Sequence, residues 1–145
     1  MSTKKLTTRI MTGAIKTCLL VLIAGTTTLA QNISTNNLTW EAVETTNLQT
    51  SVTTTLKCSF RTNSNTSVEW IQKKGQLSTL YTVTSVQGAW NNVAMPGSVT
   101  YTLQHDGKAC KMTLEKTPSG TFITMDFSKP GEYTSLHRFK IVTVQ

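Results

Sequence analysis

The sequence predicts an all-β protein of about eight antiparallel strands, and three observations lead to this prediction. Beyond residue 30 no segment places apolar residues at helical spacing, whereas Thr, Val, Ile and aromatic residues, which favour strands, dominate. Clusters of Gly, Pro, Asn and Asp separate these runs, as expected for turns. Several runs also alternate apolar and polar residues, which indicates strands with one buried and one solvated face.

The first 30 residues are predicted to be a secretory signal peptide and not part of the fold. A basic start without acidic residues leads into the apolar run 18–25, and Thr28-Leu-Ala30 then offers small residues for cleavage. The run is shorter than the about 20 apolar residues that span a bilayer. We therefore expect one mature domain over 31–145, secreted or periplasmic, with no membrane span.

The charge of the mature chain gives no reason to expect a nucleic-acid partner. Residues 31–145 hold ten of the fourteen Lys and Arg and all seven Asp and Glu, for a net charge of +3. Their longest basic run is Lys73-Lys74, and basic and aromatic residues do not alternate. Such a distribution is typical of an ordinary solvated surface.

The first half of the domain contains four predicted strands. They cover residues 38–45, 51–61, 67–73 and 77–86. The second has the clearest alternation, which predicts that one set of its side chains faces the core: Val52, Thr54, Leu56, Cys58 and Phe60.

Two turns set the register of the second half. Asp106-Gly107 is a two-residue hairpin signal, and closing it pairs His105 with Lys108. A loop over 117–120 then pairs Lys116 with Thr121. The facing pairs that follow are Leu103 with Cys110, Tyr101 with Met112, Val99 with Leu114, Leu114 with Ile123, Met112 with Met125, and Cys110 with Phe127. Both turns, placed independently, put Cys110, Met112 and Leu114 on the buried face of the strand between them. The two turn assignments therefore support each other.

The last predicted strand covers 132–144, where imperfect alternation indicates a bulge. The eight strands form two four-strand meanders joined by residues 87–97. They close either as a β-sandwich or as a barrel. In an exported chain the two cysteines Cys58 and Cys110 predict a disulfide, and two buried free thiols are the alternative. A disulfide needs Cα atoms about 4.4–6.8 Å apart, and sheets pack about 10 Å apart, so we expect a sandwich or a flattened barrel.

Two resemblances to known families accompany these patterns. The spacing from Cys58 to Trp70, with the run Pro130-Gly-Glu-Tyr133, partly resembles the immunoglobulin fold. Ser135 stands where that fold has its second cysteine. Residues 38–45, 72–90 and 120–128 also resemble small uncharacterised secreted all-β proteins of Bacteroidota. That resemblance implies an exported β-domain and brings no functional residues with it.

The connection 87–97 is the candidate binding loop, because long connections in compact β-domains are enriched in function. Trp90 and Met95, helped by Asn91 and Asn92, are the candidates for an exposed contact patch. In the interpretation that we favour, Trp90 instead folds back and closes one end of the core.

Catalytic signals are weak. Only two histidines are present, His105 and His137, and the sequence has no Gly-x-Ser-x-Gly, His-Glu-x-x-His or Cys-x-x-Cys motif. We expect no cofactor or metal site. The favoured hypothesis is a non-catalytic binding module for a protein, a glycan or a small apolar ligand. The alternatives are a lipocalin-like carrier of a small apolar ligand and, after it, a small hydrolase or a protease inhibitor.

Overall fold

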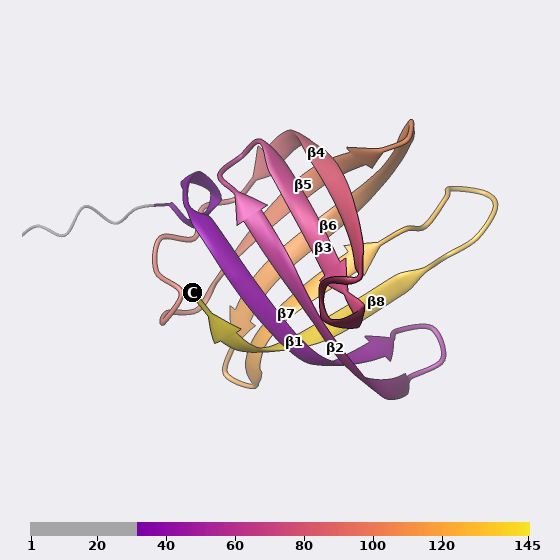
Figure 1. Cartoon of the computed structure of the whole chain (residues 1–145), viewed down its shortest axis with the longest axis horizontal. Coiled ribbons are helices and arrows are strands. Elements are labelled where there is room, and N and C mark those ends of the chain that lie inside the picture. Colours follow the sequence, from indigo (N-terminus) through magenta and orange to yellow (C-terminus); the bar gives the residue numbers. More distant parts are fainter. Residues whose placement is uncertain (1–31) are drawn as a thin grey trace, which may run out of the picture.

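The computed structural model describes residues 32–145, so the predicted signal peptide over 1–30 lies outside the described part of the chain. The domain is built of strands with two short 3-10 helices (Figure 1). In chain order the elements are η1 (Ile33–Thr35), β1 (Asn37–Asn47), β2 (Val52–Asn63), β3 (Ser67–Gln72), η2 (Lys73–Gly75), β4 (Leu77–Gln87), β5 (Gly97–His105), β6 (Lys108–Thr117), β7 (Gly120–Asp126) and β8 (Leu136–Val144). Among these described residues no helix is long and apolar enough to cross a membrane.

The eight strands close into one antiparallel barrel in which each strand pairs with the next and β8 pairs with β1. The prediction of an all-β fold with eight antiparallel strands is confirmed. The sandwich and the division into two meanders are not observed, because β4 pairs with β5 across the long connection and aligns Val83 with Leu103. The barrel therefore has one continuous wall.

The predicted register of the second half is confirmed. His105 pairs with Lys108 and Leu103 with Cys110 along β5 and β6. Lys116 pairs with Thr121, and that ladder continues as far as Lys111 and Asp126. The ladder ends there, so the further pair of Cys110 with Phe127 is not part of it. Turn chemistry and alternation were sufficient to predict the register of these strands, because the two faces of the wall differ in polarity.

The ladders between β1 and its neighbours contain the irregularities. Between Glu41 and Ala42 the β1–β8 register shifts by one residue, which leaves Val142 as the extra residue of β8. The predicted bulge in the last strand is thus present. β8 begins at Leu136, four residues later than predicted, and the preceding residues form a projecting loop.

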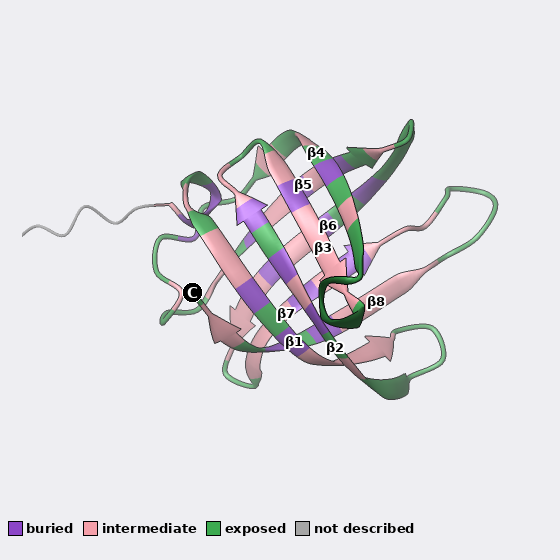
Figure 2. Ribbon diagram, in the orientation of Figure 1, coloured by how far each residue is buried: buried purple, intermediate pink, exposed green. Residues whose placement is uncertain are grey.

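The β1–β2 hairpin extends beyond the barrel wall (Figure 1), which corrects one predicted buried face. Val52 is 59% exposed and Thr54 is exposed, whereas burial on β2 begins near Cys58 and continues at Phe60. Alternation marks the two faces of a strand, but a face is buried only where other strands cover it. Figure 2 shows the exposed end of this hairpin against the buried stripes of the wall.

The structure does not contain the predicted disulfide. Cys58 and Cys110 are both buried as free thiols. Both cysteines lie on the inward face of the wall, as expected. However, β2 and β6 are four strands apart in either direction around the closed ring, so the thiols belong to opposite walls. With no bridge between the walls, the reason to expect a flattened barrel is absent, and two buried free thiols, the alternative, are observed.

Side chains fill the barrel interior. The largest fully buried residues are aromatic: Trp40, Trp90, Tyr101, Phe60 and Phe139. The Phe139 ring meets the rings of Phe60 and Trp70 edge-on, at centroid distances of 5.0 and 5.5 Å. Such edge-to-face contacts add to the stabilisation from burial.

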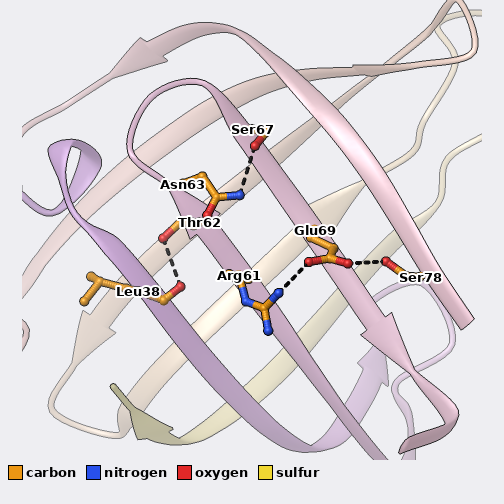
Figure 3. A network of polar contacts seen from close by, with 7 residues as sticks. All are labelled: Leu38, Arg61, Thr62, Asn63, Ser67, Glu69 and Ser78. Atoms are coloured by element: carbon orange, nitrogen blue, oxygen red, sulfur yellow. Dashed lines mark hydrogen bonds and ion pairs between the residues drawn. The ribbon is translucent and has the colours of Figure 1, made fainter. Parts of the chain in front are cut away.

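Polar contacts tie the outer wall together (Figure 3). The Arg61 guanidinium on β2 donates to the Glu69 carboxylate on β3 at 2.9 Å, and the Ser78 hydroxyl on β4 donates to the other oxygen of the same carboxylate at 2.6 Å. Threonines continue this pattern, since the hydroxyls of Thr100 and Thr113 lie 3.0 Å apart across β5 and β6. These contacts reinforce a register that the interior already determines.

Candidate functional site

The two ends of the barrel differ, and this difference locates the candidate site. In an up-and-down barrel alternate turns lie at the same end. One end, here called the plugged end, carries η1, the turns 64–66, 88–96 and 118–119, and the C-terminus. The other, here called the hairpin end, carries the turns 48–51, 73–76, 106–107 and 127–135. Figure 1 shows the first group on the left and the second on the right.

Trp90, the central residue of the predicted binding loop, closes the plugged end. Only 2% of Trp90 is exposed, and its ring centroid lies 5.9 Å from that of Trp40. The Trp90 indole N–H donates to the carbonyl of Met95 at 2.9 Å, and its own carbonyl accepts from the Ile33 N–H at 2.7 Å. A Cβ on Gly97 would lie 2.2 Å from the indole, so glycine is needed there. The favoured interpretation of Trp90 as a plug is confirmed.

The other residues of that loop stay at the surface. Asn91, Asn92 and Met95 are exposed, as predicted. The Asn92 side chain, however, is used within the loop, because its oxygen accepts from the Ala94 N–H at 2.8 Å. The structure therefore leaves this loop without the aromatic anchor that the predicted contact patch required.

Apolar side chains gather at the hairpin end. Seven large apolar residues of the described chain are exposed, and five of them belong to this end: Leu48, Val52, Leu77, Leu80 and Tyr133. Met95 lies at the plugged end and Val142 at the β8 bulge. The five residues come from three separate parts of this end, the β1–β2 hairpin, β4 and the 127–135 loop. Exposed apolar side chains at one end of a molecule are candidates for an interaction surface.

A groove runs beside the 127–135 loop at this end. The groove contains two hollows with volumes of about 560 and 610 Å³. Both are lined by Ala109 of β6 and by loop residues that include Ser128 and Tyr133. The groove thus separates the β5–β6 hairpin from the loop. Volumes of this size are typical of ligand sites in proteins.

Hydrogen bonds hold the 127–135 loop in one shape. The Phe127 N–H donates to the Ser135 carbonyl at 2.8 Å, and the Ser135 N–H donates to the Ser128 hydroxyl at 3.0 Å. Lys129 and Tyr133 form a further antiparallel bridge, with the Lys129 N–H donating to the Tyr133 carbonyl at 2.9 Å. A loop ordered before binding loses less conformational entropy when it binds.

The aromatic cluster beneath the hairpin end gives this loop a firm base. Trp70 stacks on Phe60 at 5.6 Å and lies 6.2 Å from Phe127, the first residue of the loop. His137 meets Phe127 edge-on at 6.4 Å. Burial raises the pKa of the Cys58 thiol, and the nearby Trp70 N–H partly opposes this effect. Trp70 Nε1 makes no hydrogen bond of regular geometry among the described residues, so its contact with the sulfur is weak.

The groove contains charged groups and a thiol of low reactivity. Burial, with the Asp126 carboxylate nearby, raises the pKa of Cys110 to about 11, so the thiol stays protonated at neutral pH. Because the thiolate is the nucleophile, this is the opposite of an activated cysteine. Lys129 pairs with Glu132 within the loop. Among the described residues Lys108 and Lys111 of β6 form no ion pair within 4 Å.

The two histidines lie at the same end but in different settings. His105 Nδ1 is 2.8 Å from the Leu80 carbonyl and its Nε2 is 3.3 Å from the Asp106 carboxylate. His137 lies on the interior side of β8 beside Phe127. Across residues 32–145 no three His, Cys, Asp or Glu side chains gather in a way that could hold a metal ion.

Sequence reasoning missed the groove. Its turn residues, Ser128-Lys-Pro-Gly131, were assigned to a short turn before a strand starting at Glu132. The weak alternation over 132–136 was the available signal that the strand starts later. Searches against protein-family models, curated proteins and solved structures found no match for this chain.

Proposed function

We propose that this chain is an exported binding domain that contacts a partner protein through its hairpin end. The observation that carries the proposal is the contrast between the two ends. The plugged end buries its aromatic residue, whereas the hairpin end combines exposed apolar side chains with a groove beside a pre-ordered loop. Export rests on the signal pattern of residues 1–30.

The packing of the interior favours this function over the carrier alternative. A carrier of a small apolar ligand needs space inside the barrel. Here Trp40, Phe60, Tyr101 and Phe139 all lie fully buried inside the ring. Binding on the rim requires no such space, and exposed loops on a rigid scaffold commonly carry it.

A comparison of surface variants tests the proposal. The double variant Leu80→Ser with Tyr133→Ser removes apolar contacts from the hairpin end, and Met95→Ser is the matched control at the plugged end. All three side chains are 56–59% exposed, so the fold should be unaffected. In pull-downs from cell-envelope extract we expect the double variant to recover at least about tenfold less partner, since the loss of a few apolar anchors is worth 1.4 kcal/mol or more. Equal recovery by all proteins, or a loss with Met95→Ser alone, would contradict the proposal.

A further inference from the structure

The barrel wall has a short open edge on β6 at the hairpin end. β7 pairs with β6 only as far as Lys111 and Asp126, while β6 continues to Lys108 in its ladder with β5. The segment 108–110 therefore has a strand neighbour on one side and the groove on the other. Other strand ends are also paired on one side only, such as residues 52–58 of β2, which pair with β1 and not with β3. The groove beside it sets the β6 edge apart.

The backbone of Ala109 points into the groove. Asp106 and Gly107 have φ values of +47° and +72°, as a two-residue hairpin turn requires. The first ladder pair beside such a turn, His105 with Lys108, is of the hydrogen-bonded kind. Because antiparallel pairs alternate, Gln104 and Ala109 form a non-hydrogen-bonded pair. The N–H and C=O of Ala109 thus face away from β5.

The residue that would continue the ladder opposite Ala109 is engaged elsewhere. Extending the β6–β7 register places Ser128 there. The Ser128 N–H instead donates to the Asp126 carboxylate at 2.9 Å, and its hydroxyl accepts from Ser135. Both hollows are lined by Ala109 of β6 and by Ser128 of the loop, so the groove lies between the β6 edge and the residue that would continue the ladder.

The charges along this edge favour an acidic partner. Lys108 and Lys111 are exposed and flank Ala109 on β6. The Lys129 charge beside them is balanced by Glu132, whereas Asp126 keeps its negative charge, because its hydrogen-bond donor, the Ser128 N–H, is neutral. The residues that line the groove thus carry three positive and two negative charges, and the net charge of +1 favours an acidic segment.

We infer that the β6 edge at Ala109 accepts an extended acidic peptide segment of a partner protein as an added strand. Main-chain hydrogen bonds to Ala109 supply affinity, and the lysines select carboxylate side chains. The inference rests on the proposed function and adds the kind of segment that is recognised.

Binding of defined peptides to the full chain tests this inference. The probes are acetylated eight-residue peptides of alternating Glu and Val, with Gln or Lys in place of Glu as matched controls. In ¹⁵N NMR experiments with the Glu peptide we expect exchange of the Ala109 amide to slow at least about tenfold, as expected when a solvated N–H becomes hydrogen-bonded. The Cys110 amide, already in the β5 ladder, should not change. The Gln peptide should bind more weakly and the Lys peptide not at all.

Two changes test the hydrogen bonds themselves. Ala109→Pro removes only the N–H that faces the groove, a position at which edge strands accept proline, and should abolish peptide binding. If that variant does not fold, N-methylation of successive peptide residues gives the same information on the unaltered protein. N-methyl groups on alternate peptide residues, whose N–H would face β6, should block binding. N-methyl groups on the residues between them, whose N–H faces away, should not.

The outcomes separate this inference from the proposed function. No binding of the Glu peptide, equal or tighter binding of the Lys peptide, or binding without protection of Ala109 would overturn the inference. If the pull-down loss with Leu80→Ser and Tyr133→Ser persists in that case, the hairpin end still binds, but by another mode. If that loss is absent as well, both proposals are wrong.

Discussion

Trp90 holds the plugged end together through contacts that its indole ring alone can make. The ring lies against Trp40, its N–H bonds to the Met95 carbonyl, and Gly97 leaves room for its face. Large aromatic residues in cores contribute more to stability than any single surface contact. The residue is therefore a structural element of the barrel and not a contact for a partner.

Replacing Trp90 tests this role. Trp90→Ala should lower the free energy of unfolding by about 3–5 kcal/mol, as large aromatic truncations in cores do. Chemical denaturation measures the loss, with Asn91→Ala as the control, which should stay within about 0.5 kcal/mol because Asn91 is exposed. An unchanged midpoint for Trp90→Ala would show that the plugged end is open.

The two buried thiols make stability depend on pH on the alkaline side. Burial raises the pKa of Cys110 from 9.0 to about 11, and it also raises the pKa of Cys58. Between about pH 9 and 11 the unfolded chain releases protons that the folded chain retains. The contribution of the protonated thiols to the free energy of unfolding is complete below about pH 9. It is lost as the pH rises towards the pKa of the thiols in the folded protein.

A cysteine variant isolates this effect. From about pH 8 to about pH 10.5 the wild-type free energy of unfolding should fall more steeply than that of Cys110→Ala. Without reductant, the denatured mature protein should also show two titratable thiols, since Cys58 and Cys110 are free. Parallel pH profiles, or a missing pair of thiols, would contradict this account of the interior.

The β5–β6 hairpin shows what sequence determines best at the scale of an element. A two-residue turn with positive φ at both positions has one register, and alternation then assigns every side chain to a face. The start of β8 was less predictable, because residues 132–135 look like a strand locally. Their hydrogen bonds instead close a loop through contacts such as Tyr133 with Lys129.

The turn itself can be tested by adding a side chain. Gly107 has φ of +72°, and a Cβ there would meet no atom within 4 Å, so backbone strain alone decides the effect. Gly107→Val should destabilise the protein by about 1–2 kcal/mol, the cost of a left-handed conformation for a residue with a side chain. Gln104→Val, on the same hairpin with ordinary strand geometry, is the control for thermal or chemical unfolding. Equal midpoints for the two variants would show that the turn has another geometry.

At the scale of the whole molecule, closure depends on pairings that no local pattern encodes. Eight alternating strands suit either a sandwich or a barrel, and the choice between them rested on a disulfide that the structure does not contain. The hairpin end was equally invisible in the sequence. Its exposed residues come from segments far apart in the chain, such as Leu80 of β4 and Tyr133 of the 127–135 loop, and only the closed ring brings those segments to one end.

Site-specific photo-crosslinking tests the central claim, that the hairpin end is the binding end, most directly. A photoreactive aromatic residue replaces either Tyr133 at the hairpin end or Met95 at the plugged end, two positions of similar exposure. On irradiation of intact cells that express the full chain, position 133 should give a discrete adduct with one partner protein, and position 95 should give none. The account would be contradicted by adducts that form from position 95 and not from position 133.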